Sequence, residues 1–467
     1  MLNVMHKTEE EVAEEIMASP HTQHLTFKTG LPDHLSVLFG LRVCRNLRHL
    51  TIEDDKRDEM DLAFLEHCPK LERLEIHKFD GKKIDLTPVG EFQSGIRVID
   101  IYYCKNVGTI DLSPLRKTRD LESLHVTLTK LSSLDLSPLT GLRKLRELNV
   151  HTDHLSSIDL SPVAESALTK LKLAQNNLRD VDLSPLAGLK ELCELGLGNN
   201  ELQRIDLTPL TGSALAILHL FGNKLTGVDL SPIGECPLEE VLLNTNRIVH
   251  IDLGPLSGCT TLRRLELAGN QLTDVDLAPL GSCSALSELS LSYSSPSTSL
   301  RSTLENIDLG PLRSCRELKV LKVSGHAIKT VDLSPLAACA SLETLKLDCN
   351  RLCSVNLFPL SACRKLNTHC LSGNRIRTIN LEPLKDHPEI QDIELQVNKL
   401  RFLDLTPLAN CACLKKVDMW DNPIADLVVP DFSHRAKPVL LALPAELLES
   451  DKACLGANSE AVYGSHL

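Results

Sequence analysis

The chain has 467 residues, of which 42% are hydrophobic but only 3% aromatic, and its formal net charge at pH 7 is −12. This acidic balance disfavours a protein that follows nucleic-acid phosphates or binds an anionic membrane surface. No run of about 20 apolar residues occurs, so the sequence predicts no membrane-spanning helix. The acidic N-terminus lacks the apolar stretch of a signal peptide, and we therefore expect a cytoplasmic protein.

Residues 1–34 are expected to form an N-terminal cap. Thr8 and Glu11 fit a Thr-x-x-Glu capping box, which predicts a short amphipathic helix over residues 8–18 that ends before Pro20. A cap at this place fits an array of repeats, because a terminal coil would otherwise expose its core.

The segment 35–425 is dominated by one repeat, whose clearest part is a six-residue motif such as Val-Asp-Leu-Ser-Pro-Leu at residues 181–186. The acid or amide of its fourteen copies is at Asp85, Asp111, Asp135, Asp159, Asp182, Asp206, Asp229, Asp252, Asp276, Asp308, Asp332, Asn356, Asn380 and Asp404. Most copies are 23 or 24 residues apart. A constant period in this range predicts a solenoid or a similar array, and fourteen copies do not fit one active site.

One full unit, LCELGLGNNELQRIDLTPLTGSA, begins at Leu192 and carries the pattern Leu-x-x-Leu-x-Leu, followed after three residues by Asn200. This pattern resembles the leucine-rich repeat family, in particular its short-repeat, internalin-like subclass. The resemblance implies an α/β fold: a curved right-handed solenoid of about sixteen coils, with parallel strands on the concave face. Short 3₁₀ or extended segments are expected on the convex face.

The Asn position of the repeat is expected to be structural, since a buried amide can satisfy backbone groups at a turn. This Asn ladder comprises Asn176, Asn200, Asn223, Asn246, Asn270, Asn350, Asn374, Asn398 and Asn422. Where Thr129, Asp153, Ser294 or His326 takes the position, the ladder is expected to be weaker.

The motif represented by Asp182, Ser184 and Pro185 is interpreted as a structural turn. Asn replaces Asp in two copies, which indicates that an acceptor oxygen matters more than charge. Ser is expected to be the N-cap of a short helix, with Pro at its first position and the aliphatic residues on both sides of the Asp in the core. The alternatives are surface solubility, a metal ladder and a Ser-Pro phosphorylation site. One acid per coil offers too few ligands for calcium.

Cysteine recurs four residues after the motif's Pro, where other copies have Leu, and is expected to be a buried, reduced thiol. These cysteines are Cys236, Cys259, Cys283, Cys315, Cys339, Cys363 and Cys411. A zinc site formed by cysteines between Cys349 and Cys413 is an alternative, but the repeat phase places their side chains on different parts of the coil. We predict no metal, cofactor-binding or catalytic residues.

The residues of the strands that face solvent are the candidates for binding. Rings and imidazoles gather there in the first coils, although aromatic residues are rare in this chain. The candidate partner-binding residues are His77, Tyr102, Tyr103, His125, His151, His219, Phe221 and Trp420. The alternative is chance surface composition. The Ser-rich insertion at residues 293–303 is a second candidate, or simply a tolerated loop.

The end of the chain is expected to form a C-terminal cap over residues 426–450, with a short helix near 444–450, and a loose tail over 451–467. The sequence as a whole predicts a monomeric, non-enzymatic scaffold or adaptor that binds another protein through its concave face. The family resemblance implies protein partners such as a phosphatase, a GTPase or a ubiquitin-ligase component. The alternative is a binder of glycan or nucleic acid, or a regulator that requires metal; the acidic charge disfavours it.

Overall fold

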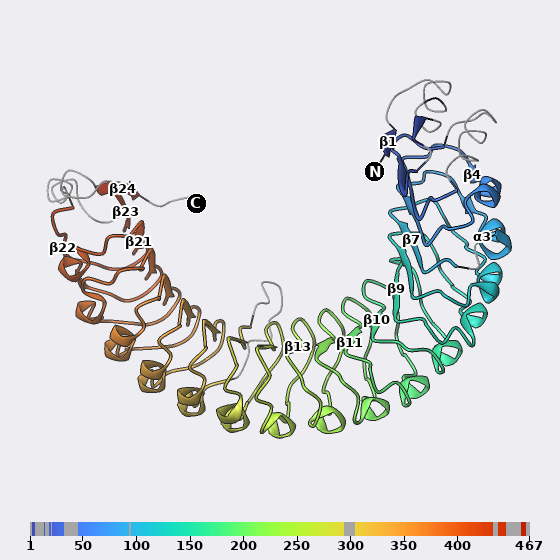
Figure 1. The fold of residues 1–467 in the computed structure, drawn as a ribbon. Coiled ribbons are helices and arrows are strands. Elements are labelled where there is room, and N and C mark those ends of the chain that lie inside the picture. Colours follow the sequence, from blue (N-terminus) through green and yellow to red (C-terminus); the bar gives the residue numbers. More distant parts are fainter. Residues whose placement is uncertain are drawn as a thin grey trace. The chain divides into compact units, whose positions relative to one another are not determined.

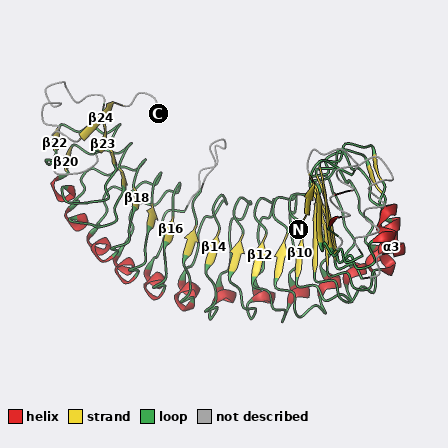
Figure 2. Ribbon diagram, turned by 45° about the horizontal axis from the view of Figure 1, so that its top comes forward, coloured by secondary structure: helices red, strands yellow, loops and turns green. Residues whose placement is uncertain are grey.

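The computed structural model describes residues 2–4, 14, 18–19, 21–31, 45–92, 95–293, 304–432, 438–444 and 459–463. The chain divides into two units, Met1–Lys224 and Leu225–Leu467, and each unit is a stack of coils (Figure 1). Within each unit, the strands of successive coils pair in parallel on one face, and 3₁₀ helices line the opposite face (Figure 2). This arrangement confirms the predicted solenoid.

The main sheet of unit 1 contains, in order across the sheet, β1 (Leu2–Val4), β2 (His24–Phe27), β3 (His49–Glu53), β5 (Arg73–His77), β7 (Val98–Tyr102), β8 (Ser123–Thr127), β9 (Glu147–His151), β10 (Lys170–Lys172), β11 (Glu194–Gly196) and β12 (Ile217–His219). A second, two-stranded parallel sheet joins β4 (Glu59–Met60) to β6 (Lys83–Ile84).

The main sheet of unit 2 contains β13 (Glu240–Leu242), β14 (Arg264–Glu266), β15 (Glu288–Ser290), β16 (Val320–Lys322), β17 (Thr344–Lys346), β18 (Thr368–Cys370), β19 (Asp392–Glu394), β21 (Lys416–Asp418), β23 (Val439–Leu443) and β24 (Ser459–Tyr463). A two-stranded parallel sheet joins β20 (Phe402–Asp404) to β22 (Asp426–Val428).

The helices are short. Unit 1 has the α-helix α3 (Thr87–Phe92) and the 3₁₀ helices η1 (Ala63–His67), η2 (Ser113–Lys117), η3 (Ser137–Leu139), η4 (Ser161–Val163), η5 (Ser184–Leu186) and η6 (Thr208–Leu210). Unit 2 has the 3₁₀ helices η7 (Ser231–Ile233), η8 (Gly254–Leu256), η9 (Ala278–Ser282), η10 (Gly310–Ser314), η11 (Ser334–Ala338), η12 (Phe358–Ala362), η13 (Glu382–Leu384) and η14 (Thr406–Leu408). No helix of the described residues is long and apolar enough to cross a membrane.

The core is built from columns of leucines. Leu171, Leu195 and Leu218 are paired in register across β10, β11 and β12, and each is fully buried. Adjacent parallel strands lie about 4.8 Å apart, so the same repeat position in successive coils comes into van der Waals contact. Burying a Leu side chain contributes roughly 1.5–3 kcal/mol, and the column repeats this gain coil by coil.

The motif that contains Asp182 closes the coil on the 3₁₀ face. Asp182 Oδ1 accepts a hydrogen bond from the Ser184 N–H over 2.8 Å. The Asp or Asn does the same in all fourteen copies of the motif, always toward the N–H two residues further on. Because Asn356 and Asn380 make the same bond, the geometry of an Asx turn, rather than charge, is what the coil uses.

The short helix of this turn begins one residue earlier than predicted, so Ser is not its N-cap and Pro is not its first residue. The 3₁₀ helix begins at Ser184 itself, so Pro185 occupies its second position, and the residue before the helix is Leu183. The Asp182 carboxylate already supplies the acceptor for the first free N–H, so the Ser hydroxyl is not needed as a cap. Instead, Ser184 Oγ donates to Asp182 Oδ2 over 2.9 Å.

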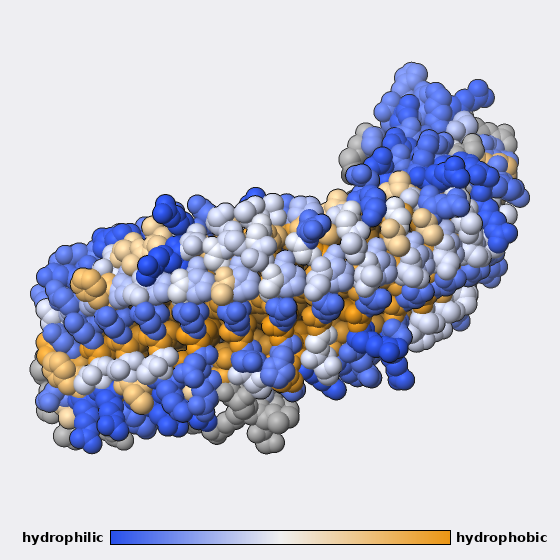
Figure 3. All heavy atoms as spheres, turned by 90° about the horizontal axis from the view of Figure 1, so that it is seen from below, coloured by the Kyte–Doolittle hydropathy of each residue, from blue (hydrophilic) through white to orange (hydrophobic). Residues whose placement is uncertain are grey.

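The aliphatic residues on the two sides of the Asp are not equally buried, contrary to the expectation that both lie in the core. The Leu that follows it, such as Leu183, is 2% exposed, whereas the residue that precedes it remains half-buried in many coils, as at Ile205 and Ile251. Figure 3 shows an apolar band bordered by hydrophilic side chains on the face seen there.

The Asn ladder bonds to backbone. Asn200 Nδ2 donates to the carbonyls of Leu197, in its own coil, and Leu173, in the preceding coil, and Asn200 Oδ1 accepts from the Leu178 N–H. All nine Asn residues of the ladder are buried. In the coil after β9, Thr152 takes this place instead of the expected Asp153: it is fully buried and its Oγ1 donates to the Leu131 carbonyl, while Asp153 stays exposed.

The recurring cysteines lie in the core. Cys236, Cys259, Cys283, Cys315, Cys339, Cys363 and Cys411 are all buried. The Cys363 thiol, for example, donates to the Leu336 carbonyl of the preceding coil over 3.3 Å, and burial raises the pKa of this thiol to about 12. The Cys363 thiol is therefore protonated at neutral pH. The buried cysteines act as small apolar side chains with one weak donor.

The sheets extend beyond the repeat region that the sequence indicates. Strand β2 precedes residue 35 and pairs in parallel with β3. Its residues Leu25, Thr26 and Phe27 are all buried. Strand β24 lies within the segment 451–467, where a loose tail is expected, and pairs with β23 along five residues. Most of the expected helix at 8–18, the helix near 444–450 and the insertion at 293–303 lie outside the described residues.

Candidate binding site on the strand face of unit 1

Two rows of solvent-facing side chains cross the strands β5, β7, β8 and β9. In the first row, Glu75 pairs in register with Asp100, and Asp100 with His125. In the second row, the residues in register are His77, Tyr102, Thr127 and His151. Parallel strands place such residues in contact with their neighbours, so the site is assembled from one or two residues of each coil.

Glu75 is held by three donors. Its carboxylate accepts from Arg73 Nε over 2.6 Å and from Thr51 Oγ1 over 2.9 Å, and it lies 3.1 Å from His49 Nε2. Burial alone would raise the pKa of Glu75, but the hydrogen bonds from Arg73, His49 and Thr51 outweigh it and hold the pKa at about 2. Glu75 therefore carries a fixed negative charge at neutral pH.

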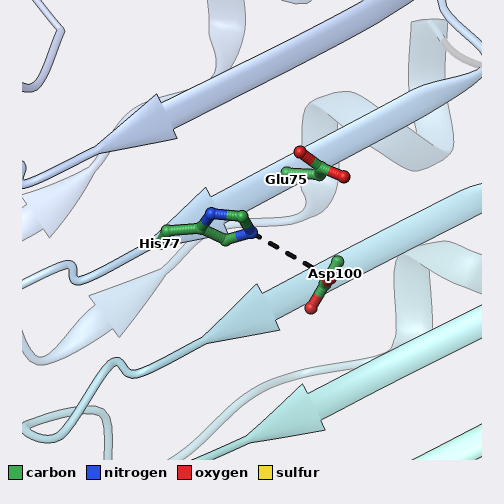
Figure 4. A group of neighbouring side chains, drawn as sticks. All are labelled: Glu75, His77 and Asp100. Atoms are coloured by element: carbon green, nitrogen blue, oxygen red, sulfur yellow. Dashed lines mark ion pairs between the residues drawn. The ribbon is translucent and has the colours of Figure 1, made fainter. Parts of the chain in front are cut away.

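Asp100 lies between two imidazoles without a close bond to either. Its Oδ2 is 4.0 Å from His77 Nε2 and 3.9 Å from His125 Nδ1, which is beyond hydrogen-bonding distance. His77 Nε2 is buried and has no hydrogen-bonding partner among the described residues. Figure 4 shows the His77 ring directed from β5 toward Asp100 on the neighbouring strand β7, with Glu75 beside them.

The rings of the site form one connected group. His77 and Tyr102 pack edge to face with 5.7 Å between ring centroids, and Tyr102 lies 6.0 Å from Tyr103. The Lys105 ammonium lies 4.2 Å from the centre of the Tyr103 ring, which is a favourable cation–π distance. Tyr102 is 43% exposed and Tyr103 39%, so both offer an apolar face to solvent.

His219 and Phe221 form a separate pair further along unit 1, with 6.1 Å between their rings. Ala174 and Gly198 stand at the equivalent positions of the coils between His151 and Phe221. A side chain at Gly198 would collide with the Phe221 ring, since a Cβ there would lie 2.7 Å from it. The eight candidate residues thus do not form one continuous stripe.

The remaining candidates are placed as follows. His125 is half-buried and its Nε2 lies 2.9 Å from Ser123 Oγ, and His151 Nε2 lies 3.3 Å from Asp153 Oδ1. Trp420 belongs to unit 2, where it follows β21 and is 38% exposed. Phe358 and Phe402 are further exposed rings of the described part of that unit.

Sequence analysis missed the carboxylates of this site. Glu75 and Asp100 are not among the predicted binding residues, because rings and imidazoles alone were taken to mark a binding surface. The signal was present: in successive strands, the middle residue of the Leu-x-Leu pattern, or of its Ile and Val variants, is Glu75, Asp100 and His125. Two acids followed by an imidazole at one repeat position place titratable groups side by side, a combination that occurs at functional sites.

Residues 166–225 and 236–295 match a family model described as leucine rich repeat. No curated protein matches the chain. Among solved structures, an LRR protein of Leptospira interrogans is similar with a TM-score of 0.67 at 18% identity, over 90% of this chain and 95% of that one. The functional domain of InlJ from Listeria monocytogenes gives 0.54 at 22% identity, over 81% and 70%. A plant peptide hormone receptor, RGFR1 in complex with RGF2, gives 0.51 at 19%, over 94% and 82%. At these identities the likeness concerns the fold alone.

Proposed function

Because the chain is a leucine-rich repeat protein, we propose that it is a binding scaffold whose strand face in unit 1 holds a protein or peptide partner. The observation that carries the proposal is the exposed pair Tyr102 and Tyr103, set beside the half-buried group of Glu75, His77 and Asp100.

Large rings at the centre of an interface contribute most of the binding energy when polar groups surround them and exclude water. Tyr102 and Tyr103 are two of the eight large hydrophobic residues that are exposed in the described part of the chain. His77 and Lys105 hold the two rings in place, so little side-chain freedom is lost when a partner covers them.

A peptide or protein suits this face better than a nucleic acid or an acidic glycan. The carboxylates Glu75, Asp100 and Glu147 line it, and they would repel phosphate groups. Support also comes from the similar fold of the plant receptor, which binds a peptide hormone. In this proposal the protein acts as an adaptor and has no catalytic activity of its own.

We further propose a cytoplasmic location. None of the fourteen cysteines of the described residues forms a disulfide, including the exposed Cys349, Cys353 and Cys413, which fits a reducing compartment. The redox state of these thiols in protein isolated from cells, measured by differential alkylation, tests the location.

The function is tested with the double variant Tyr102→Ala/Tyr103→Ala. Partners are recovered from lysate with immobilised wild-type protein, identified by mass spectrometry, and their affinities are then measured with purified components. We expect the double variant to lose at least about tenfold in affinity, since removing two central rings costs 1.4 kcal/mol or more.

Phe358→Ala is the matched control, because Phe358 is a 70% exposed ring on the 3₁₀ face. It should bind as tightly as the wild type. The proposal is wrong if the partners bind the double tyrosine variant normally but bind Phe358→Ala more weakly. The binding surface would then not be the strand face of unit 1.

A further inference from the structure

We propose that Glu75, His77 and Asp100 form a binding site for a divalent transition metal, best suited to Zn²⁺, on the strand face of unit 1. The proposal concerns this chain alone and does not depend on the identity of a partner.

The ligand atoms of the three side chains are already close enough that small side-chain movements would let them bind one metal ion. One ligand atom from each of the three side chains lies within 4.8 Å of the others, and this is the one such group of three His, Cys, Asp or Glu residues in the described part of the chain. Zn²⁺ binds nitrogen and oxygen at about 2.0–2.2 Å, which places the ligand atoms roughly 3–3.6 Å apart. If side-chain rotations move the ligand atoms of Glu75, His77 and Asp100 by about 1 Å, the atoms reach that spacing.

The unpaired atoms of the site point to a cation. His77 Nε2 is buried without a hydrogen bond, and the closest carboxylate oxygen, on Asp100, stays 4.0 Å away. Leaving a buried polar nitrogen unpaired destabilises the fold, and this cost disappears when the nitrogen lone pair binds a metal. The Asp100 carboxylate would supply the matching negative charge.

Neighbouring residues orient the proposed ligands. Arg73, Thr51 and His49 fix the Glu75 carboxylate, as partners of metal ligands commonly do. Glu75 Oε2 is engaged by both Thr51 and His49, but Oε1 accepts from Arg73 alone, so its second lone pair is left for coordination. Arg73 offsets part of the negative charge, but the two carboxylates Glu75 and Asp100 together still leave a net charge of about −1 when the imidazoles are neutral.

The mixed ligand set selects the metal. Imidazole with carboxylates suits Zn²⁺ and its neighbours in the transition series, whereas Mg²⁺ and Ca²⁺ prefer oxygen ligands alone. Three protein ligands leave a fourth position, and His125 Nδ1, which is 3.9 Å from Asp100 Oδ2, is one side chain that could take it. The metal would thus tie together the strands β5, β7 and β8.

The test is isothermal titration of the purified full chain, freed of metal by a chelator, with ZnCl₂ and separately with MgCl₂. We expect a saturable Zn²⁺ site that is lost in His77→Ala and in Asp100→Asn, and no comparable heat with Mg²⁺. Asp100→Asn keeps the shape of the side chain, so it separates loss of a ligand from loss of folding, which circular dichroism checks. His250→Ala is the matched control, since His250 is an imidazole of unit 2 that also lies beside a carboxylate, Asp274.

Exposed thiols such as Cys353 are the competing ligands. A titration with Co²⁺ separates them, because thiolate ligands give a strong charge-transfer absorption that nitrogen and oxygen ligands lack. The proposal is overturned if Zn²⁺ binds His77→Ala and Asp100→Asn as it binds the wild type, if alkylation of the thiols abolishes binding, or if the Co²⁺ complex has the thiolate absorption. The proposal is supported if His250→Ala still binds Zn²⁺ while His77→Ala and Asp100→Asn do not.

Discussion

Replacing His369 by leucine should stabilise the protein, and increasingly so as the pH falls. His369 lies in β18 at a leucine position of the repeat, in register with Leu345 and Ile393. It is fully buried, and neither ring nitrogen has a hydrogen-bonding partner among the described residues. The variant His369→Leu restores the leucine column with a side chain of similar size.

The magnitude follows from two contributions. Removing the unpaired ring nitrogens should stabilise the fold by about 1–3 kcal/mol at pH 8, where the imidazole is neutral in both the folded and the unfolded chain. Burial lowers the pKa of His369 to about 4, below the ordinary value of about 6.5. Below pH 6.5 the unfolded chain therefore binds a proton that the folded chain does not, and stability is lost as the pH falls toward 4. At pH 5 this loss amounts to about 2 kcal/mol, and the leucine variant escapes it.

Urea unfolding followed by circular dichroism, at pH 8 and at pH 5, measures both contributions. Other titrating groups cancel in the difference between variant and wild type. The expected result is a difference in unfolding free energy that grows by about 2 kcal/mol from pH 8 to pH 5. The variant His154→Leu is the control, because His154 is exposed. It shows whether replacing any histidine by leucine gives the same pH-dependent difference. An equal difference at the two pH values would refute the linkage argument, and a less stable variant at pH 8 would refute the assignment of unpaired nitrogens.

Substitutions of Asn200 and of Asp182, each with a control, test the turns that join the coils. Asn200→Ala should cost about 3 kcal/mol in urea unfolding, because it leaves the Leu178 N–H and two carbonyls unpaired in the core. Asn177→Ala, which removes one exposed bond to the Asp153 carbonyl, should cost less than about 1 kcal/mol, and similar costs for the two would contradict the ladder's role. Asp182→Ala should cost about 1 kcal/mol and Asp182→Asn much less, and equal costs would show that charge rather than the acceptor oxygen matters.

The coil itself could be predicted from sequence because its determinants are local and repeated. Leu195 and Leu218 occupy the same repeat position, and a repeat with fixed period places them in register. Strand β2 was outside the predicted repeat because no Asp-Leu-Ser-Pro motif marks its coil, although Leu25 and Phe27 pack like any other strand residues.

The site was predicted only in part. The repeat phase identifies which side chains face solvent, so the rings of His77 and Tyr102 were found. Whether neighbouring side chains touch depends on rotamers, and the 4.0 Å gap between His77 and Asp100 cannot be obtained from spacing. The same holds for His369, whose position in a leucine column is visible in the sequence but whose lack of partners is a property of the packed core.

The bonds of Asn200 end only on main-chain atoms, at Leu173, Leu178 and Leu197. Every residue type has those atoms, so the amide fits whichever coil precedes it. A gene duplication or deletion that adds or removes one whole period of 23 or 24 residues therefore creates a junction in which each amide again finds its acceptors. The copy number of coils is thus free to change by recombination, and the length of such a protein is set by the history of its gene rather than by the requirements of its core.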